Sequence, residues 1–201
     1  MKKFFYLMMM ALVPLCFTAC SSDDDDDEEN GGGSGKGAAV IDGQTLNLPY
    51  AFYFVEERES KHVGEGKAYW EVNLCSYDHV SVYKSRDYSA LPSKFSVVNI
   101  SFAGDAGETL PEGEYTDYYV SASIDMSYTS EEQKNEGIYY EGSSKNNGPV
   151  LKISKSGSDY VIEVKDLTMA TEKDGKEVSV SGNSISFKGS IEKAPEEMIN
   201  D

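Results

Sequence analysis

The sequence contains little that could build a metal or disulfide site. It has three cysteines in 201 residues, and only Cys75 lies beyond the first twenty, so the mature chain has no disulfide framework. Neither His62 nor His79 has a Cys, His or carboxylate at metal-ligand spacing, whereas a zinc site needs three or four converging ligands. We therefore expect no metal site and no cofactor, and we interpret both histidines as surface or loop residues.

Positive charge is also scarce. The chain has 18 bases against 35 acids and a net charge of -17. A general nucleic-acid binder needs clustered Lys and Arg to displace counterions from phosphates, and a basic peripheral protein needs them for anionic lipids. The composition therefore excludes a nucleic-acid partner and a membrane partner held by charge alone.

Catalytic motifs are missing as well. The sequence has no Gly-x-Ser-x-Gly nucleophile elbow and no Asp-x-Asp-x-Asp-Gly calcium loop. Cys75 has His79 four residues later, but the intervening Ser76-Tyr77-Asp78 favours a turn, and alternation puts Cys75 opposite Trp70. We interpret Cys75 as a spectator thiol, open to cross-chain pairing in an oxidising compartment, and expect no enzyme.

The amino-terminal residues have the pattern of a targeting segment. Lys2 and Lys3 precede an uncharged stretch from Phe4 to Ala19, which is shorter than the ~20 residues that span a bilayer and typical of a secretory signal. The step Phe17-Thr18-Ala19-Cys20 resembles a bacterial lipobox. That resemblance implies that residues 1–19 are removed and that Cys20 becomes the lipid-modified first residue. Two or three acyl chains would anchor the protein durably.

Residues 20–37 are predicted to be a tether. Seven consecutive acids, Asp23 to Glu29, cannot pack into a core and should be extended, and Asn30 to Gly37 has the composition of a flexible linker. As a random coil, residues 21–37 would span roughly 20–25 Å. The acids directly after the Cys resemble the export signal of Bacteroidetes surface lipoproteins, which implies an outer-membrane, outward-facing location. The residues that carry this resemblance are Ser21, Ser22, Asp23, Asp24, Asp25, Asp26 and Asp27.

The remainder reads as one all-β domain over residues 38–195, with a tail at 196–201. Short alternating runs recur between Gly, Asn, Asp and Ser clusters; in one of them Trp70, Val72 and Leu74 share a face. Asp42-Gly43 and Asp174-Gly175 suit hairpin turns, and Gly182-Asn183 is interpreted as a further turn. We predict an antiparallel β-sandwich of about nine or ten strands, with a lipocalin-like barrel as the alternative.

A second resemblance concerns the predicted β domain. Leu110-Pro111-Glu112-Gly113-Glu114-Tyr115 and the meander at residues 160–191 resemble small lipoproteins of gut Bacteroidetes. That family has β folds and no settled activity, so the resemblance supplies no catalytic residues.

Aromatic side chains are the feature that favours a binding role. The chain has 14 Tyr, 8 Phe and 1 Trp, and tyrosine suits contact surfaces because it pairs an apolar face with a polar tip. Strands also favour tyrosine without any function. The tyrosines predicted to lie in polar surroundings or opposite the core face are Tyr53, Tyr69, Tyr118, Tyr119, Tyr139 and Tyr140.

These observations favour a surface lipoprotein that acts as a binding or accessory module for a glycan or a partner protein. Three alternatives stay open: a lipocalin-like carrier in which Trp70, Phe102 and Phe187 line a cavity, a tethered hydrolase that uses an acid pair, and a structural subunit of a fibre or layer.

Overall fold

The computed structural model describes residues 34–56, 63–127, 136–144 and 148–200, and these residues form an all-β fold. Two short α-helices and one 3₁₀ helix accompany the strands: α2 (His79–Ser85), η1 (Tyr88–Ala90) and α3 (Glu197–Asn200). The strands are β1 (Gly35–Ile41), β2 (Gln44–Asn47), β3 (Tyr50–Glu56), β4 (Lys67–Cys75), β5 (Phe95–Asp105), β6 (Gly113–Tyr115), β7 (Tyr118–Ser127), β8 (Glu136–Ser144), β9 (Leu151–Ser156), β10 (Asp159–Lys173), β11 (Lys176–Gly189) and β12 (Glu192–Lys193).

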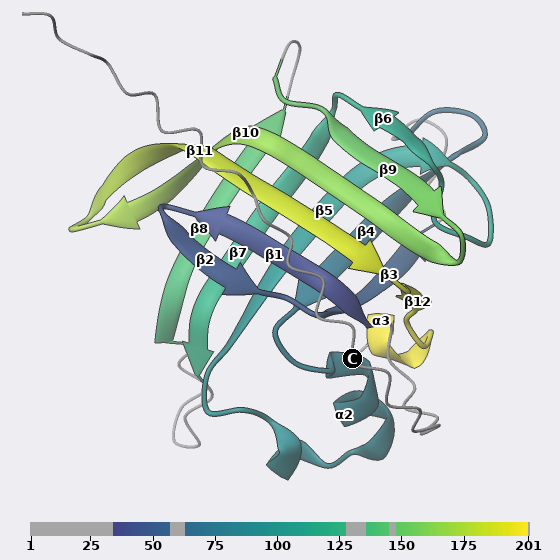
Figure 1. Ribbon diagram of the computed structural model, residues 1–201, viewed down its shortest axis with the longest axis horizontal. Coiled ribbons are helices and arrows are strands. Elements are labelled where there is room, and N and C mark those ends of the chain that lie inside the picture. The colour runs from purple at the N-terminus through teal and green to yellow at the C-terminus, as the bar shows by residue number, and fades with distance from the viewer. Residues whose placement is uncertain (1–33, 57–62, 128–135, 145–147, 201) are drawn as a thin grey trace, which may run out of the picture.

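These strands make one sheet that folds over on itself. Its order is β12-β3-β4-β5-β7-β8-β10-β11-β1-β2, and β9 joins β6 to β10. Figure 1 shows β1, β2, β9, β10 and β11 in a front layer that crosses a back layer of β3, β4, β5, β7 and β8. A sheet with one apolar face must cover that face, and folding one sheet into two layers does so. The all-β prediction is therefore confirmed.

The details differ from the prediction in number and closure. The described residues contain twelve strands, not nine or ten, and β12 pairs with β3 in parallel. The lipocalin-like barrel is wrong because the sheet does not close: β12 occupies the outer edge of β3 at Phe52 and Tyr53. Just before β1, Ser34 forms an isolated bridge with Tyr50 at the start of β3, and no strand ladder joins β1 to β3 in the described residues.

The space between the layers is filled by side chains. Trp70, Val72 and Leu74 of β4 are fully buried in the main hydrophobic cluster, as their alternation predicts. Phe102 and Phe187 belong to the same cluster and are 2% exposed. The three large rings that a carrier would use for a cavity thus pack against other apolar side chains, and none of them lines the pockets described below.

The corner between the layers is made by a bulge in the long β10–β11 hairpin. On its second edge β10 pairs with β9 over residues 159–163 and with β8 at Ala170, so the strand changes layers between these points. The register to β11 shifts there, and Gly182 takes a φ of 76°. The expected turn at Gly182-Asn183 is therefore wrong, because β11 continues through it as a bulge.

Asn183 holds this bulge together. Its side chain is 1% exposed, and its Nδ2 donates to the carbonyls of Leu167 and Val180 at 2.9 and 2.8 Å. Its Oδ1 accepts from the backbone N–H of Asp42 at 2.9 Å. The Asn183 amide thus forms hydrogen bonds with three backbone groups that have no partner in the interrupted strand ladder. The β1–β2 hairpin turn, which has positive φ at Asp42 and Gly43 as predicted, is fastened to the bulge.

The first strand begins earlier than expected. β1 starts at Gly35, so the last three residues of the predicted tether belong to the sheet, and the boundary at residue 38 is wrong. Glycine is required here by close approach: a Cβ on Gly37 would overlap the carbonyl of Leu48, and one on Gly35 would overlap that of Lys188. The Gly-rich composition reflects packing at these positions.

The segment between β4 and β5 carries a helix that the alternation pattern does not predict. Asp78 caps α2 by accepting from the backbone N–H of Ser81 at 2.9 Å. The buried Val80 packs into a second cluster with Phe52 and Cys75 on the outer face of β3 and β4. The predicted tail also packs here, since α3 contributes Met198.

Candidate functional site

The six candidate tyrosines divide evenly between the two faces of the sheet. Tyr53, Tyr118 and Tyr140 are buried in the main core, so the prediction that they face outward is wrong. Tyr69 is half-buried on the outer face, and Tyr119 and Tyr139 are exposed there; the list of exposed fractions is Tyr53 5%, Tyr118 3%, Tyr140 3%, Tyr119 36% and Tyr139 50%. Neighbouring residues on a strand point to opposite faces, so each Tyr-Tyr pair must send one ring inward.

The three buried tyrosines have structural partners. The hydroxyl of Tyr53 donates to the carbonyl of Glu108 at 3.0 Å, and that of Tyr118 donates to the carbonyl of Pro149 at 2.9 Å. Tyr140 donates to the Asp42 carboxylate at 3.1 Å. Burial raises the pKa of Tyr118 to about 12 and also raises that of Tyr53. These phenols stay protonated and tie strands to loops.

The exposed tyrosines belong to a polar surface on the back layer. Inward-facing residues of β7 and β8 alternate with outward-facing ones, and cross-strand register aligns the latter in rows. Ser121 lies opposite Glu141, and Ser123 lies opposite Tyr139. We call this surface the outer polar face; it consists of Tyr119, Ser121 and Ser123 of β7 with Tyr139, Glu141 and Ser143 of β8.

Its two rings are held by hydrogen bonds. The Tyr119 hydroxyl donates to Oε2 of Glu141 at 2.6 Å and lies 3.2 Å from the Tyr139 hydroxyl. Partial burial, followed by the hydrogen bond to Glu141, raises the pKa of Tyr119 well above its ordinary value. The pair presents two aromatic rings beside an acceptor carboxylate. Such preorganised aromatic contacts lose little conformational entropy on binding.

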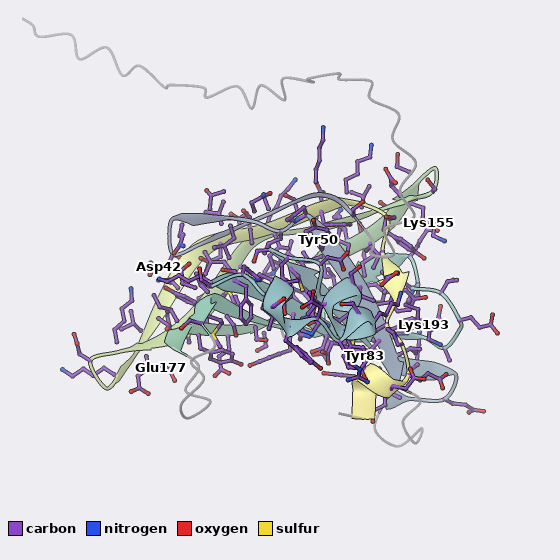
Figure 2. All side chains as sticks on the ribbon, turned by 90° about the horizontal axis from the view of Figure 1, so that it is seen from below. Asp42, Tyr50, Tyr83, Lys155, Glu177 and Lys193 are labelled. Carbon is purple, nitrogen blue, oxygen red and sulfur yellow. The ribbon has the colours of Figure 1, made fainter. Side chains whose placement is uncertain are left out.

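A groove of about 500 Å³ opens beside these rings. Its wall on one side is β8, and on the other it is the part of β10–β11 beyond the bulge. Figure 2 shows this hairpin projecting from the body with Glu177 on it. Thr171 joins the two walls, since its hydroxyl donates to the carbonyl of Tyr139 at 2.6 Å. The lining residues are Gly137, Ile138, Tyr139, Glu141, Ala170, Thr171, Glu172 and Glu177.

The groove combines hydrogen-bond acceptors with a small apolar surface. Three carboxylates, Glu141, Glu172 and Glu177, offer acceptors, and no lysine or arginine of the described ranges lines the groove. Ile138 and Tyr139 offer apolar surface, and they are 45% and 50% exposed. A few polar groups around apolar contacts are the usual makeup of a ligand site.

Tyr69 does not join this group. It lies on β4, two strands from Tyr119 across β5, and it lines a separate pocket of about 200 Å³ with Phe54, Glu71 and Met198. At ~4.8 Å per strand, two strands place it about 10 Å away along the sheet. The structure thus brings together two of the six predicted tyrosines.

Cys75 and His79 take no part in the candidate site. Cys75 is fully buried, so its thiol cannot pair with a cysteine of another chain. Burial also raises the pKa of this thiol to about 12. His79 is half-buried on α2, which corrects its assignment as a surface or loop residue; its Nδ1 lies 2.8 Å from the Tyr77 hydroxyl. His62 lies outside the described residues. In the described part of the chain, no three His, Cys, Asp or Glu side chains are placed to hold a metal ion.

Sequence reasoning missed the serines and the threonine of the site. Ser121 and Ser123 alternate with Val120, Ala122 and Ile124, so the period of two could have located an outward polar row. Thr171 gives no comparable signal, because its contact with β8 depends on where β10 changes partners.

The residues of the predicted targeting segment, Cys20, Ser21, Ser22 and the acids Asp23 to Asp27, lie outside the described residues. Within the described ranges, no helix is long and apolar enough to span a bilayer. No family model, curated protein or solved structure matches this chain.

Proposed function

We propose that this protein is a lipid-anchored, outward-facing module that binds glycan on the outer polar face and in the adjoining groove. The observation that carries the proposal is the hydrogen-bonded trio of Tyr119, Tyr139 and Glu141 at the edge of a groove of about 500 Å³. A sugar ring has an apolar face that packs on an aromatic ring and hydroxyls that donate to carboxylates.

The surroundings favour a glycan over a partner protein. Protein interfaces concentrate large apolar side chains at their centre, whereas Ser121, Ser123 and Ser143 surround the two aromatic rings here. Short hydroxyl side chains can exchange water for sugar hydroxyls without leaving a large apolar area exposed. The three carboxylates of the groove favour neutral or cationic sugars over acidic ones, because like charges repel.

The anchor is the second part of the proposal. Lipidation at Cys20 would hold the domain at a membrane, and the acids after it would direct it outward. Metabolic labelling with an alkyne fatty acid should label the native chain and not Cys20→Ala. Protease added to intact cells should shave the native protein, whereas replacement of Asp23 to Asp27 by Asn should protect it. An unlabelled, freely diffusing native chain would remove this part of the proposal.

The binding part is tested on a glycan array with the full-length chain in nanodiscs. The double variant Tyr119→Ala, Tyr139→Ala should bind at least tenfold more weakly to the glycans on the array that the native chain binds. Tyr69→Ala is the matched control, because Tyr69 lies on β4, two strands from Tyr119, and lines a separate pocket. Native binding that survives the double change, or an array on which the native chain binds nothing, contradicts the proposal.

A further inference from the structure

A second pocket lies at the other end of the molecule, in the segment between β4 and β5. It has a volume of about 300 Å³ and is lined by Tyr77, His79, Val82, Tyr83, Tyr88 and Leu91. Figure 1 shows α2 below the two layers, and Figure 2 shows Tyr83 well apart from Glu177 on the hairpin. The pocket therefore shares no wall with the groove of the proposed glycan site.

Rigid aromatic packing forms the inner wall. Tyr77 and His79 stack with ring centroids 5.3 Å apart, and Phe95 meets Tyr77 edge-on at 5.2 Å. Phe52 of the outer cluster contacts His79 at 5.6 Å. Burial holds the pKa of His79 below its ordinary value, so the imidazole is neutral at pH 7. This wall is apolar in character and fixed before any ligand arrives.

A positive charge lies beside the pocket, against two of its lining tyrosines. Arg86 ends α2, and its guanidinium lies 4.4 Å from the ring centroid of Tyr83. Hydrogen bonds to Tyr88 and Tyr83 hold its pKa above the ordinary value. Arg86 thus touches both tyrosines of the rim, and it is the only arginine among the described residues. In a chain of net charge -17, this is an unusual place for an anion to be favoured.

The acidic side chains next to this segment accept hydrogen bonds at the N-terminal ends of α2 and η1. Asp78 accepts from the backbone N–H and the hydroxyl of Ser81 at 2.9 and 2.6 Å. Asp87 accepts from the backbone N–H of Ser89 at 3.1 Å. No carboxylate from the part of the chain that the structure describes lines the pocket itself. An aromatic cage for a cation would be expected to add a carboxylate, so the charge arrangement favours an anionic ligand instead.

We propose that this pocket binds a small carboxylate that carries one apolar ring, with the ring between Tyr83, Tyr88 and Leu91 and the carboxylate at Arg86. Its volume lies at the lower end of the ~300–1,000 Å³ of ligand sites, which fits one ring and excludes an oligomer. The guanidinium supplies paired donors for a carboxylate. This site goes beyond the proposed glycan function and does not depend on it.

The test compares two probes of equal shape, 3-phenylpropionate and 3-phenylpropanamide, which differ in charge. Binding is measured by ligand-observed saturation-transfer NMR with the full-length chain in nanodiscs, and empty nanodiscs are subtracted. A ligand of this size should bind with a dissociation constant on the order of millimolar. The native chain should bind the acid at least fivefold more tightly than the amide.

Three variants give the proposal its sharp form. Arg86→Gln should weaken the acid to the level of the amide and leave the amide unchanged. Val82→Trp should fill the pocket and abolish both. Lys84→Gln is the matched control, because it removes a cation from the same helix. The Lys84 Nζ lies 3.5 Å from Oε1 of Glu192, so this variant should bind the acid and the amide as the native chain does.

Several results would overturn the proposal. They are equal binding of acid and amide by the native chain, no binding of either, an unchanged acid preference in Arg86→Gln, and an effect of Lys84→Gln as large as that of Arg86→Gln. Arg86 is exposed, so its variant should fold even if the larger Trp at position 82 does not. The Tyr119→Ala, Tyr139→Ala chain should bind both probes normally, which separates this site from the glycan site.

Discussion

Replacement of Asn183 by alanine should be among the most damaging single changes outside the apolar core. The side chain makes three hydrogen bonds to backbone groups while being 1% exposed. Each lost bond costs about 1 kcal/mol, and buried groups left without a partner cost more. The sum is about 3 kcal/mol, a large share of the ~5–15 kcal/mol that stabilises a typical domain.

The measurement is urea unfolding followed by circular dichroism. With a slope of about 2 kcal/mol/M, the midpoint should fall by about 1.5 M. Ser184→Ala on the same strand is the control, since Ser184 is half-buried and sits next to the bulge, and its midpoint should move by less than about 0.3 M. Asn183→Asp keeps the acceptor but aims a carboxylate at two carbonyls, so it should be at least as harmful at pH 7. A midpoint shift of under ~0.5 M for Asn183→Ala would refute the reasoning that the bulge depends on this amide.

Three further outcomes follow from burial and charge. Tyr118→Phe should cost about 1 kcal/mol in urea unfolding because it removes a buried hydrogen bond, whereas Tyr119→Phe on the outer face should cost under ~0.5 kcal/mol; equal costs would contradict the assignment of faces. Gly37→Ala should lower the melting temperature because its Cβ meets a backbone carbonyl, while Gly107→Ala, which meets open space, should not; equal melting temperatures would contradict the close approach. Burial raises the pKa of Glu192 above its ordinary value. The folded state therefore binds this proton more tightly than the unfolded state, and its contribution to the free energy of unfolding is lost as the pH rises through the pKa that Glu192 has in the folded protein. Glu192→Gln should therefore melt at or above the native protein at pH 7, and the difference should vanish below about pH 4; a variant that melts lower at pH 7 would show that pairing with the helix lysine outweighs burial.

Local alternation is sufficient to predict the strand content and much of the core. Trp70, Val72 and Leu74 follow the period of two into the interior, because a sheet with one buried face imposes that period on its sequence. The same rule, applied to adjacent tyrosines on one strand, assigns Tyr118 and Tyr119 to opposite faces from their positions alone.

The features that are not predictable depend on partners distant in the chain. Gly182-Asn183 has the composition of a turn, and only its contacts with Leu167 and Asp42 make it a bulge. The helix α2 is seven residues long, too short to show a periodic apolar stripe. The groove exists because β10 leaves β9 for β8, a choice that no local pattern records.

The early start of β1 has a mechanical consequence. Over residues 35–40 this strand is bonded to β11, and over residues 38–41 it is also bonded to β2. A force applied along the axis of β1 would load these hydrogen bonds together, in shear, whereas a strand peeled sideways from a sheet edge loses them one at a time. A pull along β1 is thus opposed by hydrogen bonds to strands on both of its sides, β11 and β2.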